Sequence, residues 1–269
     1  GVPPFGPGLT PRPGPLGKLR DGIARPLVLG AATRAMLPRM NAVRESHGLR
    51  AVSTVDEFFR TADLMVVTTS EPFEYPHPDW GEDILMVGAC AWEPPADPPA
   101  WLDEIDRPIV LVTTSSEFQD DASLVRTAFA ALADEPVTVV ATMPAGVADG
   151  IERPANAVVE EYVPHGPVLD RAALAITHGG MGATQKALSR GVPVVVVPFG
   201  RDQLEVAARV EVSGAGTRVP RKKLTPETLR AAARTAMALR NGARRVADGY
   251  ATAGGAVAGA DAIERRLLS

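Results

Sequence analysis

The feature that most constrains the fold is the regular alternation of short apolar runs with longer helix-like stretches from residue 108 onward. The runs are apolar throughout rather than at every second position, as in a parallel sheet covered on both faces. Strands that alternate with helices form βαβ units. The sequence therefore predicts an α/β fold whose second half is one complete doubly wound, Rossmann-like sheet. The expected strands cover residues 108–114, 137–144, 158–163, 173–177 and 192–198.

The first 107 residues differ from this pattern. A helical stretch over residues 18–50 is expected to break at Pro26 and Pro38, because proline removes a backbone donor. Only two short strand-like runs follow, at 63–69 and 83–89, whereas a doubly wound domain needs roughly five or six strands. Paired prolines over 92–107 predict an extended connection. We therefore expect an incomplete domain at 1–91, a linker at 92–107 and a complete domain at 108–269.

Composition excludes several classes of protein. The 269 residues carry a net charge of −4, so there is no basic surface for nucleic acid. No apolar run approaches the ~20 residues that span a membrane, and the start shows no signal-peptide pattern. The single cysteine, Cys90, excludes an internal disulfide framework and gives no metal cluster. A cytoplasmic protein without a bound metal is expected.

The segment at 176–183 predicts an anion site. His178 and three glycines lie between an expected strand and an expected helix, at the carboxyl end of the strand, where doubly wound sheets bind ligands. Glycine lets the backbone approach a ligand closely, and the free N–H groups of a helix start favour a phosphate or diphosphate. The other reading is a tight turn with a satisfied histidine. Because the spacing fits neither the P-loop nor the G-x-G-x-x-G pattern, a P-loop enzyme is excluded and a nicotinamide enzyme is disfavoured.

Three further segments lie at the carboxyl ends of expected strands. Asp202 and Gln203 suit vicinal hydroxyl groups, since a carboxylate accepts and an amide both donates and accepts; alternatively Asp202 caps the next helix. Tyr162 could stack on a flat base whose edge the backbone at Val163 reads, or simply end a buried strand. Ser115 and Ser116 could reach a phosphate or form a turn.

The order of these segments resembles a known family. "YVPHGPVL", then "THGGMG", then "GVPVVVVPFGRDQ" is similar to the nucleotide-sugar-dependent glycosyltransferases of family 1, which have the GT-B fold, and within them to the bacterial macrolide-type branch that modifies natural products and lipids. The resemblance covers about residues 60–269. It implies an acceptor-side domain at 1–91 and a donor-binding domain at 108–269. It also implies a UDP- or dTDP-sugar as co-substrate, no other cofactor, and an apolar small-molecule or lipid acceptor.

The resemblance also implies roles for individual residues. The donor diphosphate would be held by Ser115, Ser116, His178, Gly179, Gly180, Met181, Gly182 and Ala183. Tyr162, Val163 and His165 would frame the base, although the family usually has Trp and Gln in place of Tyr162 and His165. Asp202 and Gln203 would hold the sugar. Lys186 stands where the family usually has a ribose-binding Glu; lysine only donates, so it would reach a phosphate or extend to solvent.

The reaction that the resemblance implies is a single inverting displacement with a histidine base near the N-terminus. His47 and His77 do not match that base, so the catalytic residue is unknown. Two readings follow: a glycosyltransferase sequence lacking its first segment, or a non-catalytic half-protein that binds a nucleoside diphosphate and needs a partner chain. A serine hydrolase is disfavoured, since there is no G-x-S-x-G motif. A domain with missing strands exposes apolar faces, so a homodimer or a complementing chain is expected.

Overall fold

The computed structural model describes residues 2–78, 80–117 and 121–268, so the predicted domain ranges include a few positions outside the described part. The first half contains two helices, a pair of short strands and a 3-10 turn in the connection to the second half. Their bounds are α1 (Pro15–Ser46), α2 (Val55–Phe59), β1 (Met65–Val67), β2 (Ile84–Met86) and η1 (Ala100–Leu102). The two strands pair in parallel.

The second half is a six-stranded sheet in which every neighbouring pair is parallel. The elements are β3 (Ile109–Thr113), α3 (Ala122–Leu132), β4 (Thr138–Thr142), β5 (Ala157–Glu160), α4 (His165–Asp170), β6 (Ala172–Thr177), α5 (Met181–Leu188), β7 (Val194–Val196), α6 (Gln203–Val212), β8 (Gly216–Arg218), η2 (Arg221–Lys223), α7 (Pro226–Met237), α8 (Arg240–Ala253) and α9 (Gly255–Leu268). The strand order is β5-β4-β3-β6-β7-β8, the doubly wound order 3-2-1-4-5-6 when counted within this sheet. The predicted fold class is confirmed.

Successive residues of each strand enter different cores, which explains why the strands are apolar throughout. Ile109 and Leu111 pack with residues of α4, α5, α6 and α8, whereas Val110 and Val112 pack with residues of α3 and α7. All four side chains are at most 2% exposed. Burial on both faces therefore selects the continuous runs seen in the sequence.

The predicted breaks in the first helix are wrong: α1 continues through both Pro26 and Pro38. The two prolines are exposed, and so are Gly22 and Arg34, whose carbonyls lose their helical partners at the prolines. Those carbonyls can accept hydrogen bonds from water, so the lost backbone bonds are replaced rather than left unmade. The helix persists for that reason. The next helix, α2, is capped by Thr54, whose side chain accepts a hydrogen bond from the Glu57 amide.

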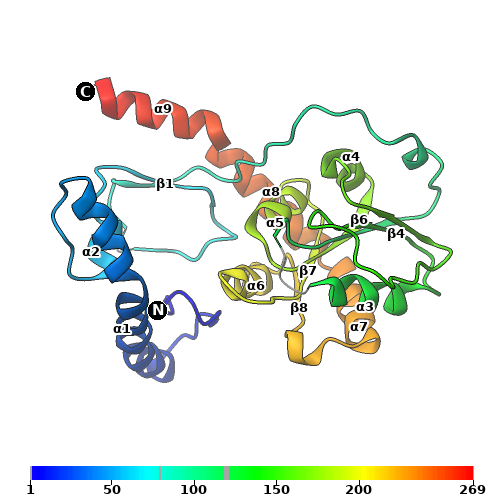
Figure 1. Ribbon diagram of the computed structural model, residues 1–269, viewed down its shortest axis with the longest axis horizontal. Helices are drawn as coiled ribbons and strands as arrows, with labels where there is room; N and C mark the ends of the chain where they lie inside the picture. The colour runs from blue at the N-terminus through cyan, green and yellow to red at the C-terminus, as the bar shows by residue number, and fades with distance from the viewer. Residues whose placement is uncertain (1, 79, 118–120, 269) are drawn as a thin grey trace.

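The last helix returns to the first half of the chain, and its C-terminal end lies beside the segment of β1 (Figure 1). The Gly255 amide donates to the Val87 carbonyl at 2.6 Å, and Arg266 Nη2 donates to the Asp63 carbonyl at 2.8 Å. At the junction between the halves the Phe73 ring packs 6.0 Å from the ring of Tyr250 in α8. The two halves are therefore joined by packing as well as by the 92–107 connection, whose boundaries stay a prediction.

Much apolar surface remains exposed. The accessible area is 14337 Å², against roughly 11,200 Å² for a compact monomer of this mass. Exposed apolar side chains form a stripe along α1, at Leu16, Leu19, Ile23 and Leu27, and a second set on α9, at Val257, Ile263, Leu267 and Leu268. Within the described residues, no helix has both the length and the apolar character needed to cross a membrane.

Candidate functional site

The residues predicted to bind a ligand lie at the switch point of the sheet. Strand order reverses between β3 and β6, and Thr113 and Thr177 pair at their carboxyl ends. Beyond this pair the segments that follow the two strands turn to opposite faces of the sheet. The segment after β3 leads to Ser115, and the segment after β6 leads to His178. A crevice outside the carboxyl ends of the strands at such a point is where doubly wound sheets bind ligands. The structure thus brings the predicted serines and the glycine cluster to one place.

His178 lies in a tight loop that needs glycine at two positions. Gly179 has φ +92°, a left-handed conformation, and its amide donates to Thr177 Oγ1 at 3.1 Å. At Gly180, which precedes α5, a Cβ atom would lie 2.5 Å from His178 Nε2. The edge of the His178 imidazole therefore occupies the space that a side chain at position 180 would need.

His178 is 7% exposed, and among the described residues its Nδ1 atom has no hydrogen-bond partner of acceptable geometry. Burial lowers the pKa of His178, although the nearby Thr113 backbone and the carboxylates of Asp121 and Asp202 oppose the shift. The ring is therefore neutral at pH 7 and carries one N–H donor. A buried polar atom without a partner is costly unless a ligand completes it.

The serine loop after β3 is held by Asp121, a residue that the sequence analysis missed. The Ser115 amide donates to Asp121 Oδ2 at 2.6 Å, and Ser115 Oγ accepts from the Glu117 amide at 3.1 Å. Ser115 is buried and Ser116 is exposed. The Ser115 hydroxyl thus supports the loop, and Ser116 is the one that faces solvent.

Asp202 and Gln203 have different surroundings. Asp202 occupies the N-cap position of α6 but makes no side-chain cap bond, and it is exposed. Its alternative interpretation as a helix cap is therefore not supported. Gln203 is 2% exposed, and its Oε1 accepts from the amides of Phe199 and Gly200 at 2.7 and 3.1 Å. Gln203 shapes the loop beside the crevice, while the Asp202 carboxylate is open to a ligand.

The segment predicted to frame a base leads into α4. Tyr162 is 58% exposed, so it does not end a buried strand, whereas Val163 is 3% exposed. His165 Nε2 lies 3.0 Å from Thr142 Oγ1. Burial and the Lys186 charge lower the pKa of His165 to about 4. The exposed phenol ring is the part of this segment that is free to stack.

Lys186 neither extends to solvent nor stands alone. Its Nζ lies 2.9 Å from Oε1 of Glu93, and the side chains of Lys186 and Glu93 are only 22% and 17% exposed. Glu93 comes from the proline-rich connection between the halves and was not singled out in the sequence. The structure therefore adds a carboxylate to the region where the family usually has a glutamate and this chain has Lys186.

A pH dependence follows from His165. Its folded-state pKa of about 4 lies below its ordinary value of 6.5, so between these values the unfolded chain binds a proton that the folded chain does not. Stability from this group is full above pH 6.5 and is lost as the pH falls toward 4. We expect the free energy of unfolding to fall by about 2 kcal/mol more between pH 7 and pH 5 in the wild type than in His165→Gln.

Urea unfolding at the two pH values measures this difference. His47→Gln is the control, because His47 is exposed at the end of α1. Equal pH slopes for the wild type and His165→Gln would contradict the assignment of a buried neutral imidazole at position 165.

Two cavities lie beside the N-terminal segment, and only the smaller one also touches the sheet domain. The smaller, about 150 Å³, is lined by Phe5, Glu74, Met181 and Asp202 among others. The larger, about 690 Å³, has walls from the N-terminal segment, α1, α2 and the 75–80 loop, with Phe5, Tyr75, His77 and Trp80 among its lining. Since Phe5 lines both, the two cavities are neighbours. His77 stacks on Trp80 at 3.9 Å, and its Nε2 lies 3.2 Å from Glu74 Oε1.

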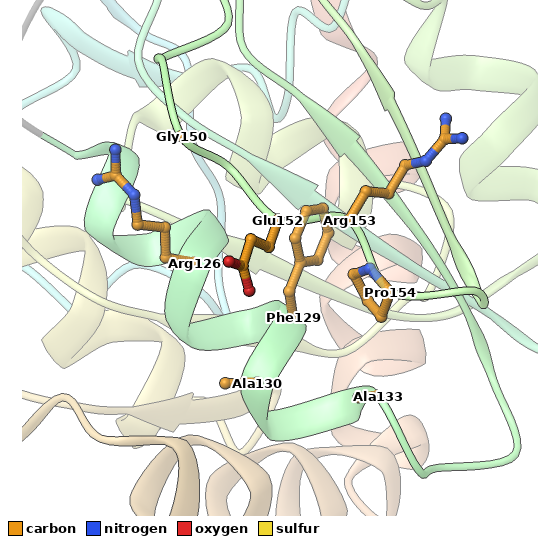
Figure 2. A pocket seen from close by; sticks show the side chains of 8 residues that line it. All are labelled: Arg126, Phe129, Ala130, Ala133, Gly150, Glu152, Arg153 and Pro154. Carbon is orange, nitrogen blue, oxygen red and sulfur yellow. The ribbon is translucent and has the colours of Figure 1, made fainter.

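A third hollow, about 400 Å³, lies on the outside of the sheet domain between α3 and the 150–154 segment. Figure 2 shows the Phe129 ring in its middle, with the side chains of Arg126 and Arg153 at opposite ends. None of the predicted site residues lines it. It is therefore separate from the switch-point crevice.

A buried ionic cluster joins the two halves next to the smaller cavity. Arg209 of α6 lies 2.8 Å from the carboxylates of both Glu74 and Glu205, and all three side chains are at most 8% exposed. Glu205 Oε1 also accepts from the amides of Gly6 and Gly8 at 2.7 Å each. Burial opposes ionisation of Glu74, but hydrogen bonding and attraction to Arg209 outweigh it and lower the Glu74 pKa. The cluster fixes loops of the first half against α6.

Metal binding receives no support from the geometry. Across the described ranges, no group of three or more His, Cys, Asp or Glu side chains is arranged to hold a metal ion. The expectation of no bound metal or other cofactor stays a prediction.

The fold and the crevice define a GT-B-type domain, a doubly wound sheet with a polar loop cluster at its switch point. Comparison with known families agrees: residues 126–255 match the family described as Erythromycin biosynthesis protein CIII-like, C-terminal domain. Through this C-terminal half, the chain belongs to the macrolide-type branch of the family 1 glycosyltransferases.

Three individual relatives illustrate the likeness. The chain is 36% identical to 4'-demethylrebeccamycin synthase of Lentzea aerocolonigenes over 97% of its own length and 64% of that protein. It is 32% identical to a PGL/p-HBAD biosynthesis rhamnosyltransferase of Mycobacterium bovis over 87% of its length and 51% of the relative. The calicheamicin glycosyltransferase CalG4 superposes with a TM-score of 0.68 at 27% identity, over 86% of this chain and 60% of that one. The chain thus spans about half to two thirds of the length of these relatives.

Proposed function

We propose that the chain is the donor-binding part of a nucleotide-sugar-dependent glycosyltransferase. It would move a hexose from a UDP- or dTDP-sugar to an apolar small-molecule or lipid acceptor, with inversion. The observation that carries the proposal is the buried His178 imidazole, which the glycine loop between β6 and α5 holds at the switch-point crevice. The names of the relatives, a rebeccamycin synthase and a rhamnosyltransferase, support the transfer of a sugar to a natural product or lipid.

The chemistry of such a transfer places most demand on the leaving group. When the acceptor oxygen attacks the anomeric carbon, negative charge develops on the departing nucleoside diphosphate. The free amides at the start of α5, with the helix dipole, favour this charge, and the neutral His178 ring adds one N–H donor. Fixed donors of this kind are effective because they need no reorganisation during the reaction. Gly180 leaves room for the His178 ring, so the glycine keeps this donor in its place.

The acceptor would enter from the larger cavity. Its about 690 Å³ falls within the usual range for small-molecule sites, and its lining mixes prolines and aromatic rings with Arg25, Asp56 and Arg60. The neighbouring smaller cavity reaches Met181 and Asp202, so an acceptor in the larger cavity would lie near the region proposed for the sugar.

A second form of this function is favoured by the exposed stripe on α1. Leu16, Leu19, Ile23 and Leu27 present one apolar face of the helix to solvent. A second copy or a complementing chain would cover this face and complete the acceptor side. In this form the chain alone would bind a nucleoside diphosphate but would not transfer sugar. Sedimentation of the purified chain as a clean monomer would argue against this form.

The proposed sugar contact of Asp202 gives a direct test. Asp202→Asn keeps the shape but weakens acceptance from sugar hydroxyls, so we expect the affinity for UDP-glucose or dTDP-glucose to fall about tenfold. The affinity for UDP or dTDP alone should change little, because these ligands carry no sugar at that place. Calorimetric titration of the wild type and the variant with each ligand measures both quantities. Equal losses for sugar nucleotide and nucleoside diphosphate would contradict the sugar contact.

A further inference from the structure

The connection between the two halves places one carboxylate at the donor side of the sheet domain. Figure 1 shows this connection passing over the region of α4 on its way to β3. Glu93 lies in it and reaches toward the domain. Its Oε1 accepts from the His165 amide at 2.9 Å, and its Oε2 accepts from the Gly166 amide at 2.7 Å. Lys186 Nζ donates to Oε1 at 2.9 Å.

These contacts hold the carboxylate ionised and in one position. Burial alone would raise the pKa of Glu93, but Lys186 and the two backbone amides outweigh burial and lower it. A carboxylate has about four lone-pair positions, and the three donors leave capacity for a further one. At 17% exposure the side chain is confined but still accessible from solvent. Glu93 is therefore a prepared hydrogen-bond acceptor.

The surroundings of Glu93 suit a nucleoside. Its carboxylate bridges the start of α4, directly after the segment of Tyr162 and Val163, and Lys186 of α5. Its neighbour in sequence, Trp92, is 73% exposed, and Tyr162 is 58% exposed, so both rings present faces on which a flat base can stack. Lysine at position 186 has no acceptor for a hydroxyl group, whereas the carboxylate that it holds does.

We propose that Glu93 is a donor-binding residue, whose carboxylate, positioned by Lys186 and the α4 backbone, accepts hydrogen bonds from the ribose hydroxyls of the nucleoside diphosphate. This inference rests on the proposed function and adds a residue from the connection between the halves to the donor site. It also makes the site depend on the path of that connection, since Glu93 reaches α4 only when the 92–107 segment crosses the domain as it does here. Lys186 is a positioning residue in this arrangement.

The test compares two ligands that differ only in the hydroxyl groups. Calorimetric titrations use UDP and 2′,3′-dideoxyuridine diphosphate with the wild type, Glu93→Gln and Lys186→Met. We expect the wild type to prefer UDP by about tenfold or more, the value of a hydrogen bond to a charged group. In Glu93→Gln the preference should shrink to about threefold or less, with the affinity for the dideoxy ligand nearly unchanged. Lys186→Met should reduce the preference in the same direction.

Glu104→Gln is the control, since Glu104 lies in the same connection and is exposed. Its preference should equal that of the wild type. The inference is overturned if Glu93→Gln and Lys186→Met lower the affinity for both ligands equally, or if they retain the full preference for UDP. Glu93 would then only attach the connection to the sheet domain, and the proposed donor site would be unaffected. Tighter binding of UDP by Glu93→Gln would overturn it as well, because the pair would then obstruct the site. If the folded wild type binds neither of these ligands nor dTDP, the proposed function fails too; if it binds dTDP alone, the same comparison is made with dTDP and 3′-deoxythymidine diphosphate.

Discussion

Replacing Arg209 by Met is expected to lower the free energy of unfolding by about 3–5 kcal/mol, because the change leaves two buried carboxylates without their cation. Glu74 and Glu205 each lie 2.8 Å from the guanidinium and are at most 8% exposed. The side chain also lies over the Tyr75 ring, with 4.5 Å from its Cζ to the ring centroid, so packing is lost along with charge.

Urea denaturation followed by circular dichroism measures this loss. Arg60→Met is the matched control, because its ion pair with Asp56 is 61% exposed on both sides and such pairs contribute about 0–1 kcal/mol. Since Glu205 holds the loop of Gly6 and Gly8, the Arg209 variant should also lose protection from hydrogen exchange at these two amides. A loss no larger than that of Arg60→Met would show that the cluster does not join the halves.

Replacing Gly180 by Ala is expected to weaken UDP binding by about 10- to 100-fold, the value of one hydrogen bond to a charged group. The backbone of Gly180 has φ −61°, which alanine adopts without strain. The added methyl would lie 2.5 Å from His178 Nε2 and 2.8 Å from Cε1, so the imidazole must leave its place. The effect therefore reports on the position of the ring rather than on the backbone.

Gly30→Ala serves as the control, because a Cβ at that helical position meets no described atom within 4 Å. Melting temperatures of both variants establish that the chains remain folded. Unchanged UDP affinity in a folded Gly180→Ala variant would mean that the His178 ring is not a diphosphate donor.

The sheet domain could be predicted closely from sequence because its signals are local. Burial on both faces makes each strand a continuous apolar run, and Thr225 followed by Pro226 is a local signal for a helix start, where Thr225 does cap α7. The interruption of α1 was wrongly predicted because proline propensity does not reveal whether the freed carbonyls face water. Sequence patterns therefore predicted the strands and the α7 cap, which depend on neighbouring residues. They did not predict the course of α1, which depends on the exposure of its backbone to water.

The ionic contacts near the site could not be predicted because their partners are distant in sequence. Glu93 lies 72 residues from His165 and 93 from Lys186, and a proline-rich connection gives no signal that one of its carboxylates turns inward. Within the other cluster, the spacing of Glu205 and Arg209 on one helix was readable, but Glu74 lies 135 residues from Arg209. The sequence also left open whether Asp202 caps its helix, which only the absence of a side-chain cap bond decides.

Titration of the purified chain with UDP and with dTDP, beside His178→Ala, tests whether the switch-point crevice binds a diphosphate. We expect one binding site per chain for at least one of the two nucleotides, and a loss of affinity of about tenfold or more in the folded variant. Absence of binding by a folded wild-type chain, or equal affinity in His178→Ala, would contradict the claim that the switch-point crevice is a diphosphate site.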